Sequence, residues 1–388
     1  MTSDSDIEQY RENLQAETDG AARPWSLQPQ YLPSPQEDNP DSRVWTPAAP
    51  TAKLGPVRIY RDEDANLAAL AGRTVAVIGY GNQGQAQALN LRDSGVGVIV
   101  GGIEDEYARQ ARDDGFTVLP IAEATVQGDI LLLLVPDEVQ RHVYAESIAP
   151  YLSPGKTLGF AHGFNIHFGL IHPPAEVDVV MVAPRMIGSG VRQRFLDGAG
   201  SPAYVAVWQD ASGRAWPTAL ALARGIGATR AGAIETTFAQ ETELDLFLEQ
   251  ATWAALTRAL ILSFEVLVED GFDPEMTALE LYGSYEAAEV LREMAQRGFF
   301  RQMRLHSRTS QYGTLSRGPR VLPDSMKRTF RRVLEEIRSG RFAREWRREQ
   351  EAGYPNFRRL WEEAQAHPMN AAEEPARRLF PSLPASDS

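Results

Sequence analysis

The sequence predicts an α/β protein in which a Rossmann-like parallel sheet with helices is followed by an all-α domain. Three observations lead to this fold class. Strand-length apolar runs alternate with helical stretches from about Arg73 to Trp208, which is the pattern of a doubly wound parallel sheet. A glycine-rich G-x-G-x-x-G turn joins the first of these strands to the first helix. From Glu241 to about Leu360 the periodicity is almost entirely helical.

The first strand–helix–strand unit has the clearest signals. The run TVAVIG (74–79) predicts a buried strand that ends on glycine. Helical spacing over 83–94 stops at Gly95, and glycine commonly terminates a helix. The run GVIVG (97–101) predicts the second strand, so these residues form one βαβ unit.

The remaining strands are predicted from apolar runs that lack the alternation of a half-buried strand. Continuous runs of this kind are typical of parallel strands that are buried on both faces. They are DILLLLVP (129–136), TLGFAHG (157–163), DVVMVAP (178–184) and AYVAVW (203–208). Helical stretches connect them, so we expect a parallel sheet.

Four segments are expected along the chain. Residues 1–54 are rich in Pro, Asp, Glu, Gln and Ser without a sustained period, which predicts a flexible arm; docking on a partner subunit is the alternative. The dinucleotide-binding domain covers 55–237. The helical domain covers 238–380, and its apolar stretch 249–269 predicts a helix buried on several sides. A short tail (381–388) follows.

The composition limits the possible functions. The chain has no cysteine, which excludes disulfides, cysteine-ligated zinc, iron–sulfur clusters and a thiol nucleophile. A net charge of −13 disfavours nucleic acid as a partner. From their length we expect the apolar runs to be too short to span a bilayer, and the acidic N-terminus lacks a signal-peptide pattern. We therefore expect a cytoplasmic protein with no membrane partner.

The GYGNQG turn is the strongest local motif. Gly79 permits the tight turn out of the strand, Gly81 lets the backbone approach a pyrophosphate, and Gly84 lets the helix pack closely on the sheet. The helix N-terminus then offers unpaired N–H groups to the phosphates. A glycine turn without a ligand is the alternative, but the strand before it and the helix and strand after it favour a dinucleotide. The candidate cofactor-binding residues are Gly79, Tyr80, Gly81, Asn82, Gln83 and Gly84.

The end of the second strand indicates which nicotinamide cofactor is preferred. Glu104, Asp105 and Glu106 could accept hydrogen bonds from a ribose diol, and they would repel a 2′-phosphate. Arg109 is the nearby cation. We therefore predict NADH over NADPH, with Glu104 as the ribose-binding candidate. The alternative is that these acids are a solvated helix start, where negative charge also suits the helix dipole.

Six segments carry a resemblance to a known family. They are GRTVAVIGYGNQGQAQALNLRDSGV (72–96), LVPDEVQ (134–140), AHGFNIHFGLIHPPAEVDVVMVAP (161–184), GAGSPAYVAVWQDASG (198–213), ARGIGATRAGAIETTFAQETELDLFLEQ (223–250) and SQYGTLSRGPRV (310–321). With these matches in order, the chain resembles the ketol-acid reductoisomerases, the acetohydroxyacid isomeroreductases of branched-chain amino-acid synthesis, from Val57 to about Phe380.

The resemblance implies a Rossmann-like N-terminal domain and a knotted helical C-terminal domain. It implies that a 2-aceto-2-hydroxy acid is isomerised by alkyl migration and then reduced by a nicotinamide hydride to a 2,3-dihydroxy acid. It also implies two Mg²⁺ ions. A Lewis acid would polarise the carbonyl group and stabilise an alkoxide during migration. Magnesium prefers hard oxygen ligands such as carboxylates.

The first pair of the family's metal carboxylates matches Asp245 and Glu249, and Glu249 is also a catalytic candidate by resemblance. Their spacing of four residues places them on one face of a helix. Without the resemblance such a pair is most often a solvated surface, so the metal-binding interpretation depends on it.

The second pair is less regular. Glu280, in PEMTALE (274–280), takes the third metal position by resemblance. The fourth should follow four residues later, where Ser284 stands. Two residues are inserted in this region relative to the family, and Gly283 could let the helix bulge. Glu286 is therefore the candidate for the fourth ligand, with Glu289 as a weaker one.

Further site residues follow from the resemblance. His162 matches the family's active-site histidine at a strand end and is a candidate for catalysis and cofactor binding; a structural hydrogen-bond donor is the alternative. Pro136 is a candidate for cofactor binding, and Ser307 corresponds to the substrate-binding serine. The family's site forms between two subunits, so a homodimer is expected, with Asp245 and Glu249 from one subunit and Glu280 and Ser307 from the other.

The chain departs from the family after 178–184. The family has Ala-Pro-Lys-Gly-Pro-Gly-His there, and this chain has Ala-Pro-Arg-Met-Ile-Gly-Ser (183–189). Arg185 keeps the positive charge of the lysine and is a catalytic candidate on that ground, but it is bulkier and does not give up its proton. Met186 and Ile187 add apolar bulk, which indicates a changed substrate.

Three functions are open from the sequence. The first is a ketol-acid reductoisomerase with NADH preference and altered substrate tolerance. The second is a diverged relative in specialised metabolism that reduces a ketone or imine without migration. The third is a cofactor-binding protein without catalysis, against which the retained His162, Asp245 and Glu249 argue.

Overall fold

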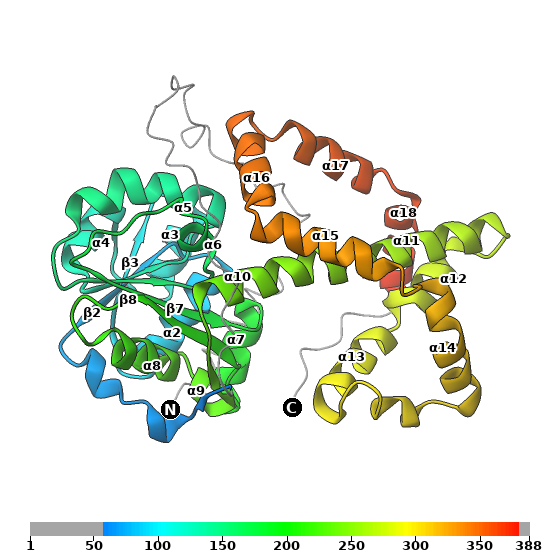
Figure 1. Cartoon of the computed structure of the whole chain (residues 1–388), viewed down its shortest axis with the longest axis horizontal. Coiled ribbons are helices and arrows are strands. Elements are labelled where there is room, and N and C mark those ends of the chain that lie inside the picture. Colours follow the sequence, from blue (N-terminus) through cyan, green and yellow to red (C-terminus); the bar gives the residue numbers. More distant parts are fainter. Residues whose placement is uncertain (1–56, 380–388) are drawn as a thin grey trace. The chain divides into compact units, whose positions relative to one another are not determined.

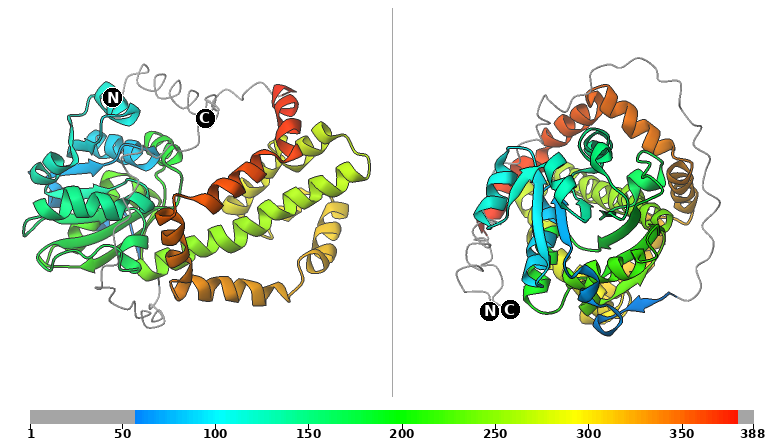
Figure 2. Two further views of the ribbon diagram at one scale, coloured as in Figure 1. Left: turned by 90° about the horizontal axis from the view of Figure 1, so that it is seen from above. Right: turned by 90° about the vertical axis from the view of Figure 1, so that its left-hand side faces the viewer.

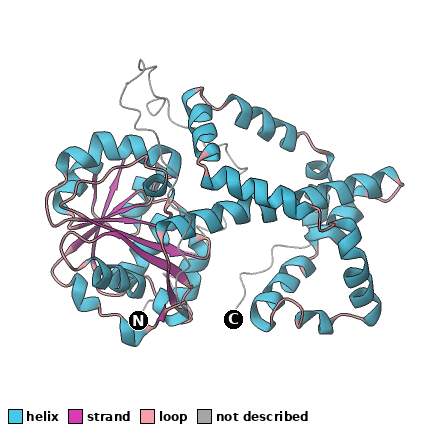
Figure 3. Ribbon diagram, in the orientation of Figure 1, coloured by secondary structure: helices cyan, strands magenta, loops and turns pink. Residues whose placement is uncertain are grey.

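The computed structural model describes residues 57–379, which divide into two compact units between Asp245 and Leu246. We call them the sheet unit (57–245) and the helical unit (246–379). Figure 3 shows strands in the first unit and helices throughout the second. The predicted arm (1–54) and tail (381–388) lie outside the described residues. The domain boundary expected near residue 237 lies directly before helix α10 (Phe238–Phe247).

The described residues form one sheet of nine strands in the order β1-β9-β8-β7-β6-β5-β2-β3-β4. The strands are β1 (Ile59–Tyr60), β2 (Thr74–Ile78), β3 (Gly97–Gly102), β4 (Val118–Pro120), β5 (Ile130–Leu133), β6 (Thr157–Phe160), β7 (Asp178–Pro184), β8 (Ala203–Gln209) and β9 (Ala233–Glu235). Every strand predicted from an apolar run is present. Strands β2 to β7 pair in parallel, so their carboxyl ends lie at one edge of the sheet.

The expectation of a parallel sheet is wrong at β8, which pairs antiparallel with β7. The helix between these strands, α7 (Gly188–Leu196), packs against α2 (Asn82–Asp93) instead of crossing the sheet. The chain therefore returns to the edge that it left, and the Arg185 N–H donates to the Pro202 carbonyl at 2.8 Å. The periodicity could not reveal this, because a helical stretch between two strands is compatible with either return.

Helices cover both faces of the sheet, as Figure 1 and Figure 2 show. Besides α2, α7 and α10 they are α3 (Glu106–Asp113), α4 (Ile121–Gln127), α5 (Asp137–Val143), α6 (Phe164–His167), α8 (Ala215–Gly225) and α9 (Ala228–Ala231). One core cluster of the sheet unit includes the fully buried Ile78, Leu133 and Met181 on the strands. Burying each such side chain contributes roughly 1.5–3 kcal/mol. The strand ends are thus a rigid base for the residues that follow them.

The helical unit confirms the helical pattern of the second half of the sequence. Its elements are η6 (Leu248–Trp253), α11 (Ala254–Glu269), α12 (Pro274–Ala278), η7 (Leu279–Gly283), α13 (Glu286–Arg297), η8 (Gln302–Leu305), α14 (Arg308–Val321), α15 (Met326–Arg338), α16 (Arg341–Glu351), α17 (Pro355–Gln365) and α18 (Pro368–Leu379). A small core of Phe264, Ala278 and Ala372 joins α11, α12 and α18. The knot implied by the resemblance stays a prediction.

One helix contradicts two expectations. Phe238–Glu269 is a helix of 32 residues whose most apolar window has a mean hydropathy of 1.5, which by length and composition is enough to cross a membrane. The expectation that no apolar run is long enough was therefore wrong. Only 11% of that window is buried within the described structure, so the stretch is not buried on several sides either. One such helix is weak evidence for a membrane segment, since helices in the cores of other proteins pass the same test.

Candidate active site

The carboxyl edge of the sheet gathers the candidate residues of the sheet unit. The glycine turn follows β2, Asp137 follows β5, His162 follows β6 and Arg185 follows β7. Strands β2, β5, β6 and β7 are parallel neighbours, so these four segments lie side by side. Ligands of open α/β sheets bind at this edge.

The glycine turn has the geometry that its motif predicts. Gly79 adopts a φ of 95°, and a Cβ there would lie 2.7 Å from Val135 Cγ1 on the neighbouring segment. A Cβ on Gly84 would lie 2.1 Å from the Gly79 carbonyl oxygen, so this glycine lets α2 approach the turn. Around Gly81 there is open space, and α2 begins directly after it. A phosphate could therefore approach the helix N-terminus.

Two side chains of the turn contact the loop that follows β7. Gln83 donates from Nε2 to the Met186 carbonyl at 2.9 Å, while its Oε1 accepts from Gln87 at 3.1 Å. Asn82 accepts through Oδ1 from the Gly188 N–H. The turn and the loop are thus tied together, and a cofactor role for these two side chains stays a prediction.

Two other cofactor candidates make defined contacts. Tyr80 is buried and donates its hydroxyl to Asp114 at 2.8 Å, so its side chain anchors the turn. Glu104 is exposed and forms a two-armed ion pair with Arg112 at 2.6 and 2.7 Å. Asp105 caps α3 by accepting from the Ala108 N–H, as the helix-start interpretation expected.

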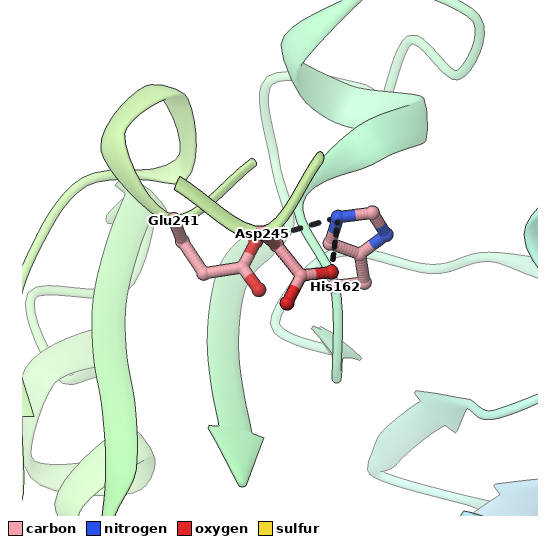
Figure 4. Close-up of side chains that lie close together, drawn as sticks. All are labelled: His162, Glu241 and Asp245. Atoms are coloured by element: carbon pink, nitrogen blue, oxygen red, sulfur yellow. Dashed lines mark ion pairs between the residues drawn. The ribbon is translucent and has the colours of Figure 1, made fainter. Parts of the chain in front are cut away.

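His162 lies at the centre of the site. Its Nδ1 lies 2.6 Å from Asp137 Oδ2, and its Nε2 lies 3.5 Å from Asp245 Oδ2 and 3.9 Å from Glu241 Oε2. Figure 4 shows the histidine and the two α10 carboxylates turned toward one another. One ligand atom from each of these three residues falls within 4.8 Å of the others.

Arg185 completes the cluster from the end of β7. Its Nη1 donates to Asp245 Oδ1 at 3.0 Å and its Nη2 to Glu241 Oε1 at 3.2 Å. The guanidinium also lies over the Tyr204 ring, 5.0 Å from its centroid. One planar side chain therefore bridges both carboxylates.

Burial and charge shift the protonation of the cluster. Burial by itself lowers the pKa of His162, but the attraction of Asp137 and of the two α10 carboxylates outweighs it and raises the pKa to about 10. Burial raises the pKa of Glu241 above its usual value, against the opposing effects of His162 and Arg185. The site thus holds two cationic groups against three acids.

Asp137 and Glu241 were not predicted from the sequence. Glu241 had a signal, because it stands four residues before Asp245 just as Glu249 stands four after it. Asp137 lies in the segment 134–140 but has no spacing relation to His162, so only the fold brings them together.

Comparisons with known proteins identify the family. Residues 69–232 match the model of the acetohydroxy acid isomeroreductase NADPH-binding domain, and 238–382 match that of the ketol-acid reductoisomerase C-terminal domain. The chain belongs to the ketol-acid reductoisomerase family. Its members are NAD(P)-dependent oxidoreductases, as the turn on the sheet edge predicts.

Individual relatives agree. A ketol-acid reductoisomerase (NADP(+)) from Pyrobaculum calidifontis is 50% identical over 83% of this chain and 98% of its own length. The one from Saccharopolyspora erythraea is 47% identical over 83% and 97%. A solved structure of an NADH-preferring ketol-acid reductoisomerase from an uncultured archean matches with a TM-score of 0.80 and 39% identity, covering 83% of this chain and 99% of that one.

The family's other site residues lie in the helical unit. Glu249 is exposed in η6, a π-helical stretch, so the helix widens just after Asp245. Glu280 is exposed in η7, and Glu286 is the exposed first residue of α13. Ser307 caps α14 by accepting from a backbone N–H. Their roles as ligands or substrate contacts stay predictions.

The helix does bulge where the sequence indicated an insertion. The π-helical η7 ends at Gly283, and Tyr285 adopts a left-handed φ of 61° before α13 begins. The helix is thus interrupted between Glu280 and Glu286, and the insertion of two residues between 280 and 294 stays a prediction.

The residues at the sheet edge fit a divalent cation. Asp245 and Glu241 offer the oxygen ligands that magnesium prefers, and the buried Nε2 of His162, which has no hydrogen-bond partner, lies beside them. The converging donors and the orphaned nitrogen both point to a ligand there. The Arg185 guanidinium reaches the same two carboxylates from the other side.

Proposed function

We propose that this chain catalyses the ketol-acid reductoisomerase reaction, the Mg²⁺-dependent alkyl migration and NAD(P)H reduction of a 2-aceto-2-hydroxy acid to a 2,3-dihydroxy acid. One observation carries the proposal. The cluster of His162, Glu241 and Asp245 shares a sheet edge with the glycine turn, so a group bound at the cluster and a dinucleotide at the turn would be neighbours.

The metal is proposed to be held by Asp245 and Glu249, together with Glu280 and Glu286 of a partner subunit. Bound magnesium would supply the Lewis acidity for migration, and NAD(P)H would supply the hydride. Asp245 favours this assignment because its carboxylate lies in a cluster of possible ligand atoms with Glu241 and His162.

The protein's own groups position the reactants. Asp137 fixes the ring of His162 by the 2.6 Å contact to Nδ1 and thereby aims Nε2 at the cluster. Arg185 provides a fixed positive charge where the substrate carboxylate or a developing oxyanion would lie. Ser307 is proposed to hold the substrate from the partner subunit, and Glu249 to act beside the metal.

NADH is proposed as the preferred cofactor. Glu104 engages both arms of Arg112 and so occupies the cation that a 2′-phosphate would need. The similar solved protein that is described as NADH-preferring favours the same conclusion. The relatives described as NADP(+) enzymes are a reason to test both cofactors.

A homodimer is proposed because several large apolar side chains of the helical unit are exposed. Leu248, Trp253, Leu262 and Val266 of the long helix are all exposed. Exposed apolar side chains that gather on one element favour an interface with another chain. The acidic residues at the start of the same helix belong to the candidate site, so a second copy fits better than a bilayer. This agrees with the expected cytoplasmic location.

The runner-up is a diverged reductase that acts on a ketone or imine without migration. The segment 185–189 favours it, because it replaces the family's lysine and places the exposed Met186 and Ile187 beside the site. Steady-state oxidation of NADH or NADPH by the purified chain with 2-acetolactate and Mg²⁺ separates the candidates once the product is identified. The proposal requires a migrated carbon skeleton.

A further inference from the structure

The Arg185 guanidinium binds both carboxylates of the candidate metal cluster, those of Asp245 and Glu241. Its Nη1 lies 3.0 Å from Asp245 and its Nη2 3.2 Å from Glu241, so each carboxylate has one oxygen committed to the guanidinium. A planar fork can bridge two carboxylates in this way, whereas a lysine ammonium acts as a single point charge.

The backbone after Arg185 is held by side chains at the start of α2. Gln83 fixes the Met186 carbonyl, and Asn82 accepts from the Gly188 N–H. A Cβ on Gly188 would lie 1.9 Å from the Asn82 carbonyl, so the loop is in close contact with the first turn of α2. The Tyr204 ring also lies against the guanidinium, so both the loop and the side chain of Arg185 have contacts that hold them near the carboxylates.

From this geometry we propose that Arg185 is a resident cation of the metal site, which competes with a divalent cation for Asp245 and Glu241 and thereby weakens metal binding. The inference rests on the proposed function for Asp245 as a metal ligand, and it includes Glu241 because this residue lies in the same cluster of possible ligands. Because an arginine keeps its proton at any working pH, this charge is permanent. A divalent cation must displace the guanidinium or share the carboxylates with it.

The proposal has a consequence for the affinity of the site for a divalent cation. Two carboxylates next to a fixed cation attract a second cation less strongly than the same carboxylates alone. Removing the guanidinium should therefore tighten metal binding even though a native contact is lost. A structural role alone would give the opposite result, since loss of the bridge would loosen the ligands.

The test is the binding of Mn²⁺ to the metal-stripped full chain, without nucleotide or substrate, followed by the electron paramagnetic resonance of free Mn²⁺. Arg185→Gln removes the charge and both contacts, and Arg185→Lys keeps the charge but cannot bridge. Arg112→Gln is the matched control, because it breaks a two-armed pair with exposed Glu104. Circular dichroism checks the fold of each variant.

We expect Arg185→Gln to lower the Mn²⁺ dissociation constant about tenfold or more, Arg185→Lys to lie between, and Arg112→Gln to match the unaltered chain. If all proteins bind Mn²⁺ and both Arg185 variants bind equally or more weakly than the unaltered chain, the inference is wrong and the proposed function stands. If none binds Mn²⁺, the metal site of the proposed function fails together with the inference.

Discussion

The pairing of Asp137 with His162 gives a sharp prediction, because it tests a residue that acts only through another. The proposed change is Asp137→Asn, which keeps the shape of the side chain but removes its charge. The 2.6 Å contact to His162 Nδ1 then loses its ionic character. Asp113→Asn, on an exposed surface of α3, is the matched control.

The expected effects of Asp137→Asn on stability, on the pKa of His162 and on kcat follow from the contacts in the site. A hydrogen bond to a charged group contributes about 1.5–3 kcal/mol, so the unfolding free energy near neutral pH should fall by about 2 kcal/mol. The pKa of His162, raised to about 10, should drop by at least one unit, which corresponds to about 1.4 kcal/mol. We expect kcat to fall about 10- to 100-fold with little change in the KM for NADH, since the ring loses its orientation.

The pH dependence has a definite sign. The folded-state pKa of His162 lies above the usual value of 6.5, so the interaction stabilises the protein fully below pH 6.5. This contribution is lost as the pH rises toward about 10. The stability difference between the unaltered chain and Asp137→Asn should therefore be largest in weakly acidic solution and shrink at alkaline pH.

The assays are chemical denaturation over pH and histidine NMR titration of the metal-free protein, with His162→Gln to assign the resonance. Kinetics of the double variant complete a mutant cycle. In the His162→Gln background, Asp137→Asn should have little further effect on kcat. An unchanged His162 pKa, or full additivity of the two changes, would refute the positioning role.

Three further predictions concern the metal, the cofactor and the assembly. Asp245→Asn should abolish Mg²⁺-dependent turnover while NADH binding, measured by fluorescence, is retained; undiminished activity would remove Asp245 from the site. Glu104→Gln should release Arg112 and raise the ratio of kcat/KM for NADPH to that for NADH several-fold, and an unchanged ratio would show that this pair does not select the cofactor. Light scattering should give at least a dimer, and a pure monomer would count heavily against a site built from two subunits.

The local elements were predictable because their signals are short-range. The strand 74–79, the glycine turn and the helix that ends at Gly95 each follow from neighbouring residues, and the structure has all three. The bulge between Glu280 and Glu286 was likewise indicated by an irregular spacing and a glycine.

Long-range pairing could not be obtained in the same way. The direction of β8 depends on where α7 packs, and the partner of His162 lies 25 residues earlier in the chain. The exposed face of the long helix has the same composition as a buried one, so its periodicity gave the wrong burial. The bridge from Arg185 to two carboxylates depends on tertiary placement alone.

The central claim is tested most directly by the structure of the product. The purified chain is incubated with 2-acetolactate, Mg²⁺ and NADH, and in parallel with NADPH, and the product is analysed by proton NMR. Migration followed by reduction gives 2,3-dihydroxy-3-methylbutanoate, with two methyl singlets, and this is the result that we predict. Reduction without migration gives the isomeric 2,3-dihydroxy-2-methylbutanoate, with one singlet and one doublet. That product, or no turnover while NADH still binds, would contradict the proposed function.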